Sequence, residues 1–165
     1  MLIRPAAPQD FPSLRAIEAR GGEAFRAVGM PEIADDEPMP PAVLASLRVW
    51  VLVDPEPVAW VAVAVVDGGA HVEQVCTAPE RAGERLGAAL LDHVGAWARG
   101  EGLAAVTLTT FRDVPWNAPY YRRLGFAEVA EPGPGLRELV AREASHGLDP
   151  AARVVMARAV CAEAV

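Results

Sequence analysis

A strand that leads directly into a helix holds the residues whose types and spacing point most clearly to chemistry. The strand ends at Pro79, Gly83 lies in a short loop, and an apolar helix starts at Arg85. The free backbone N–H groups and the dipole of a helix start favour an anion such as phosphate. Many α/β proteins turn here with a glycine for structural reasons alone, and neither G-x-x-x-x-G-K-[ST] nor G-x-G-x-x-G is present. The segment indicates an anion site without identifying its ligand.

Other reactive side chains suggest less. Cysteine inside an apolar strand is usually an inert small hydrophobic residue, so we do not expect Cys76 to act as a nucleophile that accepts an acyl group. His71, His93 and His146 lack ligand spacing with cysteine or acidic partners. No metal site is therefore predicted.

The elements that must position these residues follow from the periodicity of the sequence. Short β-branched runs between turn sequences predict strands, three of them consecutive and antiparallel, and apolar residues three or four apart predict helices. Gly21-Gly22 is expected to end the first helix, and Gly29–Pro41, rich in proline and acidic residues, to form a loop. Strands are expected over residues 1–5, 49–54, 58–67, 70–78 and 104–109, from residue 126 and near 153–160, and helices over residues 8–20, 42–48, 85–99, 117–124 and near 136–145.

Neither an internal repeat nor a linker divides the chain. Its 165 residues suffice to bury a core without cross-links. We therefore expect residues 1–165 to form a single mixed α/β domain, with Trp60 and Trp97 in its core.

The composition excludes several classes of protein. At 52% hydrophobic and 22% charged residues, the chain is not intrinsically disordered, and 22 acidic against 15 basic residues argue against a general nucleic-acid binder. The longest apolar run, Val58–Val66, is far shorter than the roughly 20 residues that span a bilayer, and no basic-then-apolar signal opens the chain. Cys76 and Cys161 cannot form a disulfide framework. These features favour the reducing cytoplasm and no membrane partner.

Charge is distributed unevenly along the chain. Every basic residue is arginine, and the net charge is −7. Residues 1–80 hold 12 acidic residues and 5 arginines, whereas residues 81–165 hold ten of each. Either the first half has a solvated acidic surface, or the two halves face different partners, a cationic one in front and an anionic one behind.

Two motifs at the expected separation resemble those of the GNAT N-acetyltransferase family. The first comprises Pro79, Gly83 and Gly87 followed by Leu90-Leu91, and the second is Asn117–Phe126, whose Tyr-Arg-Arg-Leu-Gly-Phe ending matches closely. The order of elements agrees over essentially the whole chain. The resemblance implies a GNAT-like α/β (α+β) fold, a mixed and mostly antiparallel central sheet flanked by helices. It also implies acetyl-CoA as co-substrate, with the CoA pyrophosphate at the first motif, and no metal.

The first motif departs from the family pattern Q/R-x-x-G-x-G/A. Ala82 stands at the Gln/Arg position and Arg85 at the first Gly, while Gly87 matches. Arg85 either turns its side chain away from phosphate or grips the pyrophosphate with its planar guanidinium. Arg81 is a candidate to replace the side chain missing at Ala82.

The resemblance also implies which residues bind CoA. Backbone groups of Val75, Cys76 and Thr77 are expected to pair with pantetheine as an added strand. Asn117 is a candidate to bond the pantetheine or to cap its helix, two compatible roles, and Arg122 is a further candidate near the phosphates. The expected cofactor-binding residues are Val75, Cys76, Thr77, Arg81, Ala82, Gly83, Glu84, Arg85, Leu86, Gly87, Ala88, Asn117 and Tyr121.

Acetyl transfer to an amine needs a base and an acid, because an alkylamine of pKa ~10 is protonated at neutral pH and the thiolate must gain a proton. The resemblance implies Tyr121 as the general acid, with Tyr120 and Phe126 as packing residues. It implies Glu73 as a base acting through water; the alternative is an ordinary solvent-facing glutamate, and Gln74 is an unlikely base. Burial would raise the pKa of Glu73. Phe111 and Trp116 either line the acceptor site or pack the fold.

We therefore expect an N-acetyltransferase that moves acetyl from acetyl-CoA to a primary amine by direct attack. The acceptor is expected to be small or cationic and to pass the acidic segment Ala34–Glu37 and Glu73. The alternative is a CoA-binding module with little or no transferase activity, suggested by Ala82 and Arg85. An arginine-rich interaction domain would leave both motifs unexplained. The sequence leaves a homodimer open.

Overall fold

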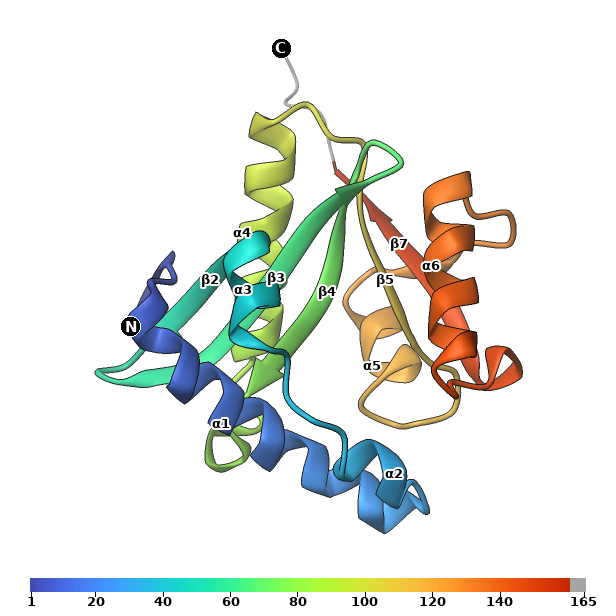
Figure 1. The fold of residues 1–165 in the computed structure, drawn as a ribbon. Coiled ribbons are helices and arrows are strands. Elements are labelled where there is room, and N and C mark those ends of the chain that lie inside the picture. Colours follow the sequence, from blue (N-terminus) through green and yellow to red (C-terminus); the bar gives the residue numbers. More distant parts are fainter. Residues whose placement is uncertain (161–165) are drawn as a thin grey trace. The chain divides into compact units, whose positions relative to one another are not determined.

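The computed structural model describes residues 1–160, so Cys161 lies outside the described part of the chain. Seven strands in this part are hydrogen-bonded in the order β1-β2-β3-β4-β5-β7-β6 (Figure 1). Most of the described pairs are antiparallel, which confirms the predicted mixed α/β fold. The chain forms two compact units. The first comprises Met1–Val63 and Gln74–Asp92, and the second comprises Ala64–Glu73 and His93–Val165.

The sheet of the first unit is built from the β-branched runs near its start. β1 (Leu2–Pro5) and β3 (Pro57–Val66) both pair antiparallel with β2 (Arg48–Val53), so that Val51 lies between Arg4 and Trp60. The predicted bounds of these three strands differ from the observed ones by at most one residue at each end.

The helices of the first unit differ more from expectation. α1 (Phe11–Gly22) includes Gly21 and Gly22, and the chain continues as a 3-10 helix over Glu23–Val28 until Gly29 adopts a φ of 76°. The α-helix thus ends at the predicted glycine pair, two residues later than expected, but helical backbone continues as a 3-10 helix up to Gly29. Glycine weakens a helix but does not forbid it, whereas a left-handed residue stops it. The expected loop contains a short helix, α2 (Pro31–Ala34), and α3 spans Pro41–Ser46.

The core of the first unit forms between α1, α3 and the strands. Trp60 is fully buried, and its Nε1 donates to the carbonyl oxygen of Leu14 at 2.9 Å, which confirms its predicted core position. The buried residues of this cluster are Leu14, Ile17, Leu44, Val49, Val51, Trp60, Ala62 and Ala78.

The second unit contains the parallel pair of strands. β4 (Gly69–Thr77) starts in this unit and pairs parallel with β5 (Ala105–Phe111), with Val72 opposite Leu108. β7 (Arg153–Ala159) pairs antiparallel with β5 and with the two-residue β6 (Ala127–Glu128). β5 continues two residues past the expected end.

Three further α-helices follow in the described part of the chain. α4 (Leu86–Gly100) starts in the first unit and ends in the second, where Trp97 is half-buried rather than fully enclosed. α5 (Ala118–Arg123) and α6 (Pro134–Ser145) belong to the second unit. No helix within residues 1–160 has both the length and the apolar character needed to cross a membrane.

Candidate active site

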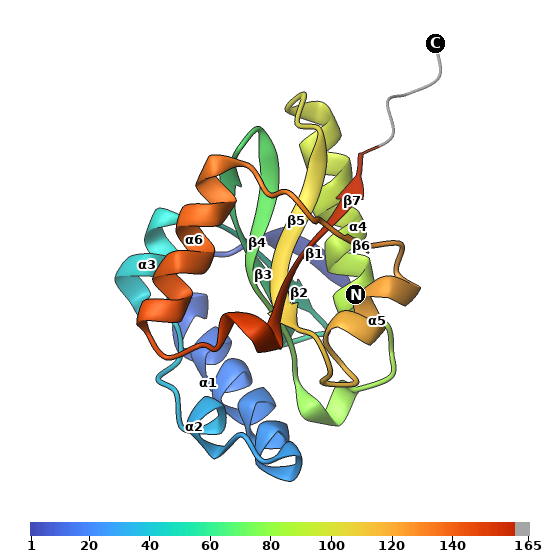
Figure 2. The same ribbon diagram turned by 90° about the vertical axis from the view of Figure 1, so that its right-hand side faces the viewer.

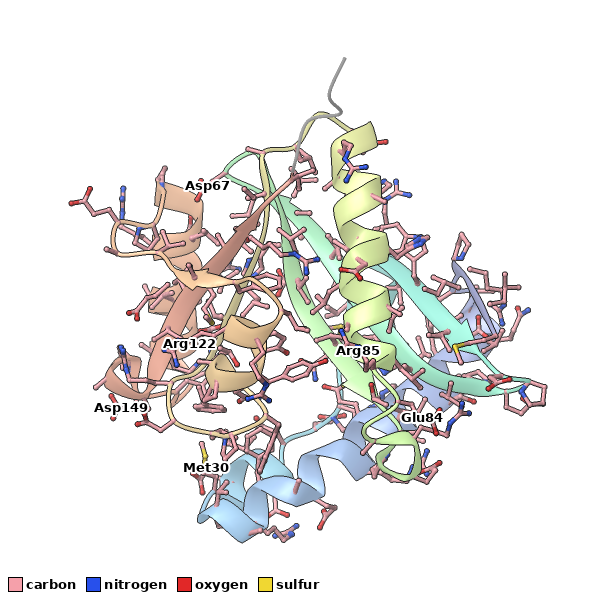
Figure 3. The ribbon with its side chains drawn as sticks, turned by 180° about the vertical axis from the view of Figure 1, so that it is seen from behind. Met30, Asp67, Glu84, Arg85, Arg122 and Asp149 are labelled. Atoms are coloured by element: carbon pink, nitrogen blue, oxygen red, sulfur yellow. The ribbon has the colours of Figure 1, made fainter. Side chains whose placement is uncertain are left out.

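The predicted phosphate loop joins β4 to α4 in the first unit. A 3-10 turn (Pro79–Arg81) follows β4, and Ala82–Arg85 are exposed before α4 begins at Leu86. Figure 3 shows Glu84 in this loop and Arg85 where the chain enters α4. The loop is therefore open to a ligand from solvent.

The backbone of this loop keeps the shape that a glycine favours. Gly83 has a φ of 86°, and Arg85, at the family's glycine position, has a φ of 61°. A left-handed conformation costs a non-glycine residue about 1 kcal/mol. The carbonyl of Arg85 accepts the N–H of Ala89 at 3.0 Å, the first helical bond. The N–H groups of the first turn of α4 have no partner within the helix and lie at its positive end, the arrangement that binds anions.

The two arginines of the loop have different environments. Arg81 donates from Nε to both oxygens of Glu84 at 2.8 Å and from Nη2 to Asp54 at 2.8 Å. These bonds raise the pKa of Arg81 and lower the pKa values of both carboxyls. Contact of Arg81 with phosphate therefore requires exchange of a carboxylate partner. In the described part of the chain no hydrogen bond or ion pair holds the exposed guanidinium of Arg85.

The end of β4 carries the three residues expected along pantetheine. Val75, Cys76 and Thr77 are half-buried in the first unit. Burial raises the pKa of the Cys76 thiol, with a further contribution from the charge of Glu18, and Gln74 Nε2 donates to Cys76 Sγ at 3.2 Å. A nucleophilic cysteine needs a lowered pKa, so this environment favours an inert thiol.

Glu73 lies at the end of the second unit's part of β4. Its side chain is exposed, and no hydrogen bond or ion pair holds its carboxylate within residues 1–160. Desolvation by neighbouring protein atoms raises its pKa, Arg142 opposes this effect, and Glu143 adds to it. A raised pKa suits a carboxylate that must accept a proton near neutral pH.

The end of α5 explains the Tyr-Arg-Arg-Leu-Gly-Phe motif. Gly125 has a φ of 92°, its N–H donates to Arg122 at 3.1 Å, and the N–H of Phe126 donates to Tyr121 at 3.1 Å. These two bonds form a Schellman motif, whose usual apolar contact is made here by the rings of Tyr121 and Phe126, 5.8 Å apart. The motif therefore sets the position of the Tyr121 ring, which also meets Tyr120 edge-on at 5.4 Å.

Asn117 precedes α5, as expected. Its carbonyl accepts the N–H of Tyr121 at 3.0 Å, but its side chain makes no capping hydrogen bond. The capping alternative for its side chain is therefore wrong.

The structure also shows the environment of aromatic and arginine side chains on β5, α5 and β7. Phe111 is buried, with the guanidinium of Arg153 4.6 Å from its ring centroid, whereas Trp116 is exposed. Arg122 is exposed on α5 (Figure 3). Arg158, which the motifs did not indicate, donates to the carbonyl of Leu124 at 3.0 Å and covers the ring of Phe126 at 4.9 Å.

The expected residues thus fall into two groups. The first unit brings together the end of β4 and the loop Arg81–Ala88; the second contains Glu73, Asn117 and Tyr121. Within the described residues, no group of three or more histidine, cysteine, aspartate or glutamate side chains is arranged to hold a metal ion.

A sequence profile of the Acetyltransferase (GNAT) family matches residues 14–126, more than half of the chain. The chain belongs to this family. The match includes both the loop before α4 and the Tyr121 motif of this GNAT protein.

Solved structures share the fold of this GNAT protein at low sequence identity. The ribosomal-protein-S18-alanine N-acetyltransferase of Escherichia coli gives a TM-score of 0.65 at 19% identity, over 99% of this chain and 96% of that one. Rv2747 of Mycobacterium tuberculosis, in complex with CoA, gives 0.67 at 18% identity over 98% and 100%. The PaiA N-acetyltransferase of Thermoplasma acidophilum, in complex with coenzyme A, gives 0.64 at 12% identity over 96% and 98%. At these identities the likeness establishes the fold alone.

Proposed function

We propose that this GNAT protein transfers an acetyl group from acetyl-CoA to a primary amine by direct attack. The observation that carries the proposal is the start of α4, where an exposed loop with two left-handed residues leads into free N–H groups. CoA contains a pyrophosphate, which such a helix start binds well. Two solved neighbours of the same fold were determined with CoA.

The expected CoA contacts come mostly from the first unit. The N–H groups of Leu86, Gly87 and Ala88 and the free guanidinium of Arg85 would bind the pyrophosphate, since Arg81 already has two carboxylate partners. Backbone groups of Val75, Cys76 and Thr77 would pair with pantetheine. The side chain of Asn117, which makes no capping hydrogen bond, would be a further hydrogen-bonding partner for pantetheine. Acetyl-CoA supplies the activated carbonyl.

Glu73 and Tyr121 would move the protons. Glu73 accepts, through water, one proton from the protonated amine, whose nitrogen then forms the C–N bond as the C–S bond breaks. Tyr121 donates its phenolic proton to the departing sulfur and regains a proton from the new amide nitrogen. The reaction then releases one proton in total, because the ammonium loses two and the thiol gains one.

The acceptor is proposed to be cationic. Residues 1–80 carry the whole net charge of −7, and Asp35, Asp36 and Glu37 are exposed between α2 and α3. A negative field draws cations towards a site and repels anions. Polyamines, amino sugars and basic peptide termini have the required chemistry.

Two measurements test this function. Acetyl-CoA should raise the melting temperature, and thiol release over a panel of amines should reveal turnover with at least one cationic amine. Stabilisation without turnover on any amine would contradict the transferase and support a CoA-binding module. Absence of stabilisation would contradict both.

A further inference from the structure

α6 places an acidic side chain on the sheet of the second unit. Oε1 of Glu143 accepts the hydroxyl of Thr109 at 2.6 Å and Nη2 of Arg153 at 3.2 Å. Nη2 of Arg153 also lies 3.0 Å from the hydroxyl of Thr109. Figure 2 shows α6 alongside β5 and β7, the strands that supply these partners. The contact fixes the carboxylate with respect to the sheet.

The charge of Glu143 is only partly compensated. Both hydrogen bonds go to Oε1, whereas Oε2 is buried without a partner in the described structure, as is Nε of Arg153. The side chains of Glu143 and Arg153 are 21% and 13% exposed. Charges removed from water are screened weakly, so the field of Glu143 reaches neighbouring groups.

The pairing of β4 with β5 brings Glu73 towards this cluster. The paired positions end with Val72 opposite Leu108, and Glu73 and Thr109 are the next residues along the two strands. Two residues earlier, Nδ1 of His71 lies 2.9 Å from the hydroxyl of Thr107, which shows that these alternate positions share one face. Glu73 and Thr109 lie on the same face, which is the face that Glu143 contacts.

We propose that Glu143 is a positioning residue, a fixed negative charge that α6 holds near Glu73 so that Glu73 is a stronger proton acceptor. The inference rests on the proposed function, because it assumes that Glu73 is the base. Glu143 acts through Glu73 and does not touch the reacting atoms.

The other charged or titratable groups near Glu73 act differently. Arg142, next to Glu143 on α6, lowers the pKa of Glu73, whereas Glu143 raises it. Burial lowers the pKa of His71 to about 4, so His71 is neutral near pH 7. Arg153 is held by Thr109, Glu143 and the ring of Phe111. Arg142 and Glu143 are therefore the adjustable charges, and they act in opposite directions.

Neutral substitutions at these two positions give opposite predictions. Glu143→Gln keeps the size and one acceptor oxygen but removes the charge, so the acidic limb of the pH profile of kcat/KM should move down by about 0.5–1 pH unit. Arg142→Gln should move it up by a similar amount. Glu138→Gln removes an exposed charge from the same helix and should leave the limb in place. Glu143→Asp keeps the negative charge and should leave the limb close to its wild-type position.

A titration of the Glu73 carboxyl by 13C NMR measures the effect of Glu143 and Arg142 on the pKa of Glu73 without the need for turnover. The shifts should match those of the pH profiles in sign. If Glu143→Gln lowers the melting temperature but leaves the Glu73 titration unchanged, the residue is structural and the inference is wrong. If the titration shifts but the protein acetylates no amine, the coupling stands and the proposed function fails.

Discussion

His71 is a buried, titratable side chain of the second unit. It is 1% exposed and pairs with Thr107, and burial lowers its pKa from 6.5 to about 4. Between these values the unfolded chain binds more protons than the folded one, so the free energy of unfolding rises with pH from about 4 to 6.5. His71 therefore destabilises the folded state as the pH falls through this window.

Replacing His71 should flatten that dependence. The asparagine amide of His71→Asn can still pair with Thr107 but does not titrate. The variant should therefore lack the His71 contribution to the fall in the free energy of unfolding at acid pH, which reaches about 3 kcal/mol below pH 4. Urea unfolding at several pH values measures the slope. His146→Asn, at an exposed histidine, is the control; an unchanged slope in His71→Asn would contradict the argument.

At the residue scale, Tyr121 is the proposed general acid. The Schellman bonds at Gly125 and Phe126 hold the end of α5, and the ring of Tyr121 packs against Phe126. Tyr121→Phe removes the proposed proton donor and should lower kcat by about 100-fold. Tyr120→Phe should keep kcat. Equal kcat in the wild type and Tyr121→Phe would remove the general-acid assignment.

At the scale of elements, the loop before α4 contains a charged residue, Arg85, in a backbone conformation that is unfavourable for it. Arg85 has a φ of 61°, which glycine adopts freely, and its guanidinium is unpaired in the described structure. Arg85→Gly should raise the free energy of unfolding by about 1 kcal/mol and weaken CoA binding. Arg85→Ala should weaken CoA binding without the gain in stability.

Chemical denaturation and calorimetric titration with CoA separate these two effects. Unchanged CoA affinity in both variants would show that the Arg85 side chain turns away from the phosphates.

α6 depends on an aspartate from the turn between β3 and β4. Asp67, labelled in Figure 3, accepts the N–H groups of Gly135 and Leu136, both at 2.9 Å. A Cβ at Gly133 would lie 2.6 Å from Asp67 Oδ2, so glycine permits this close approach. The carboxylate therefore caps α6 from a distant part of the chain.

Asp67→Asn should weaken this cap. Asparagine tolerates the φ of 51° at this position but loses the charge and one acceptor oxygen. We expect the free energy of unfolding to fall by about 1 kcal/mol, measured by urea denaturation. Asp113→Asn, at an exposed loop position, should have little effect, and an equal loss in both variants would contradict the capping role.

At the scale of the whole molecule, the charge distribution bears on the acceptor. The net charge is −7, and it resides entirely in residues 1–80. Attraction over distances beyond the Debye length of about 10 Å at 0.1 M salt is screened. kcat/KM for a diamine should therefore fall by about 10-fold between low and high salt, while that for an aromatic amine, uncharged at neutral pH, should change little. Equal salt dependence for both amines would refute the cationic acceptor.

Apart from the short helix α2, the order of the strands and α-helices was predictable from the sequence, as were the family and the loop before α4. They depend on local rules: β-branched runs form strands, apolar residues three or four apart form helices, and a strand–loop–helix exposes backbone N–H groups. The 3-10 helix that follows Gly21-Gly22 is also local in origin, because glycine only lowers the propensity for a helix and the left-handed residue comes later, at Gly29.

Contacts between residues far apart in the chain were decided only by the tertiary structure. Three such contacts join residues that are 27 to 69 positions apart: Arg81 with Asp54, Thr109 with Glu143, and Asp67 with the first turn of α6. Sequence periodicity reports which face of an element is apolar, but not which side chain of another element will meet it. The sequence alone therefore determined the fold and the residue types available for acyl transfer. The tertiary structure decided which of those charged side chains are already paired with another residue and which remain available to bind a ligand or to shift the pKa of a neighbouring group.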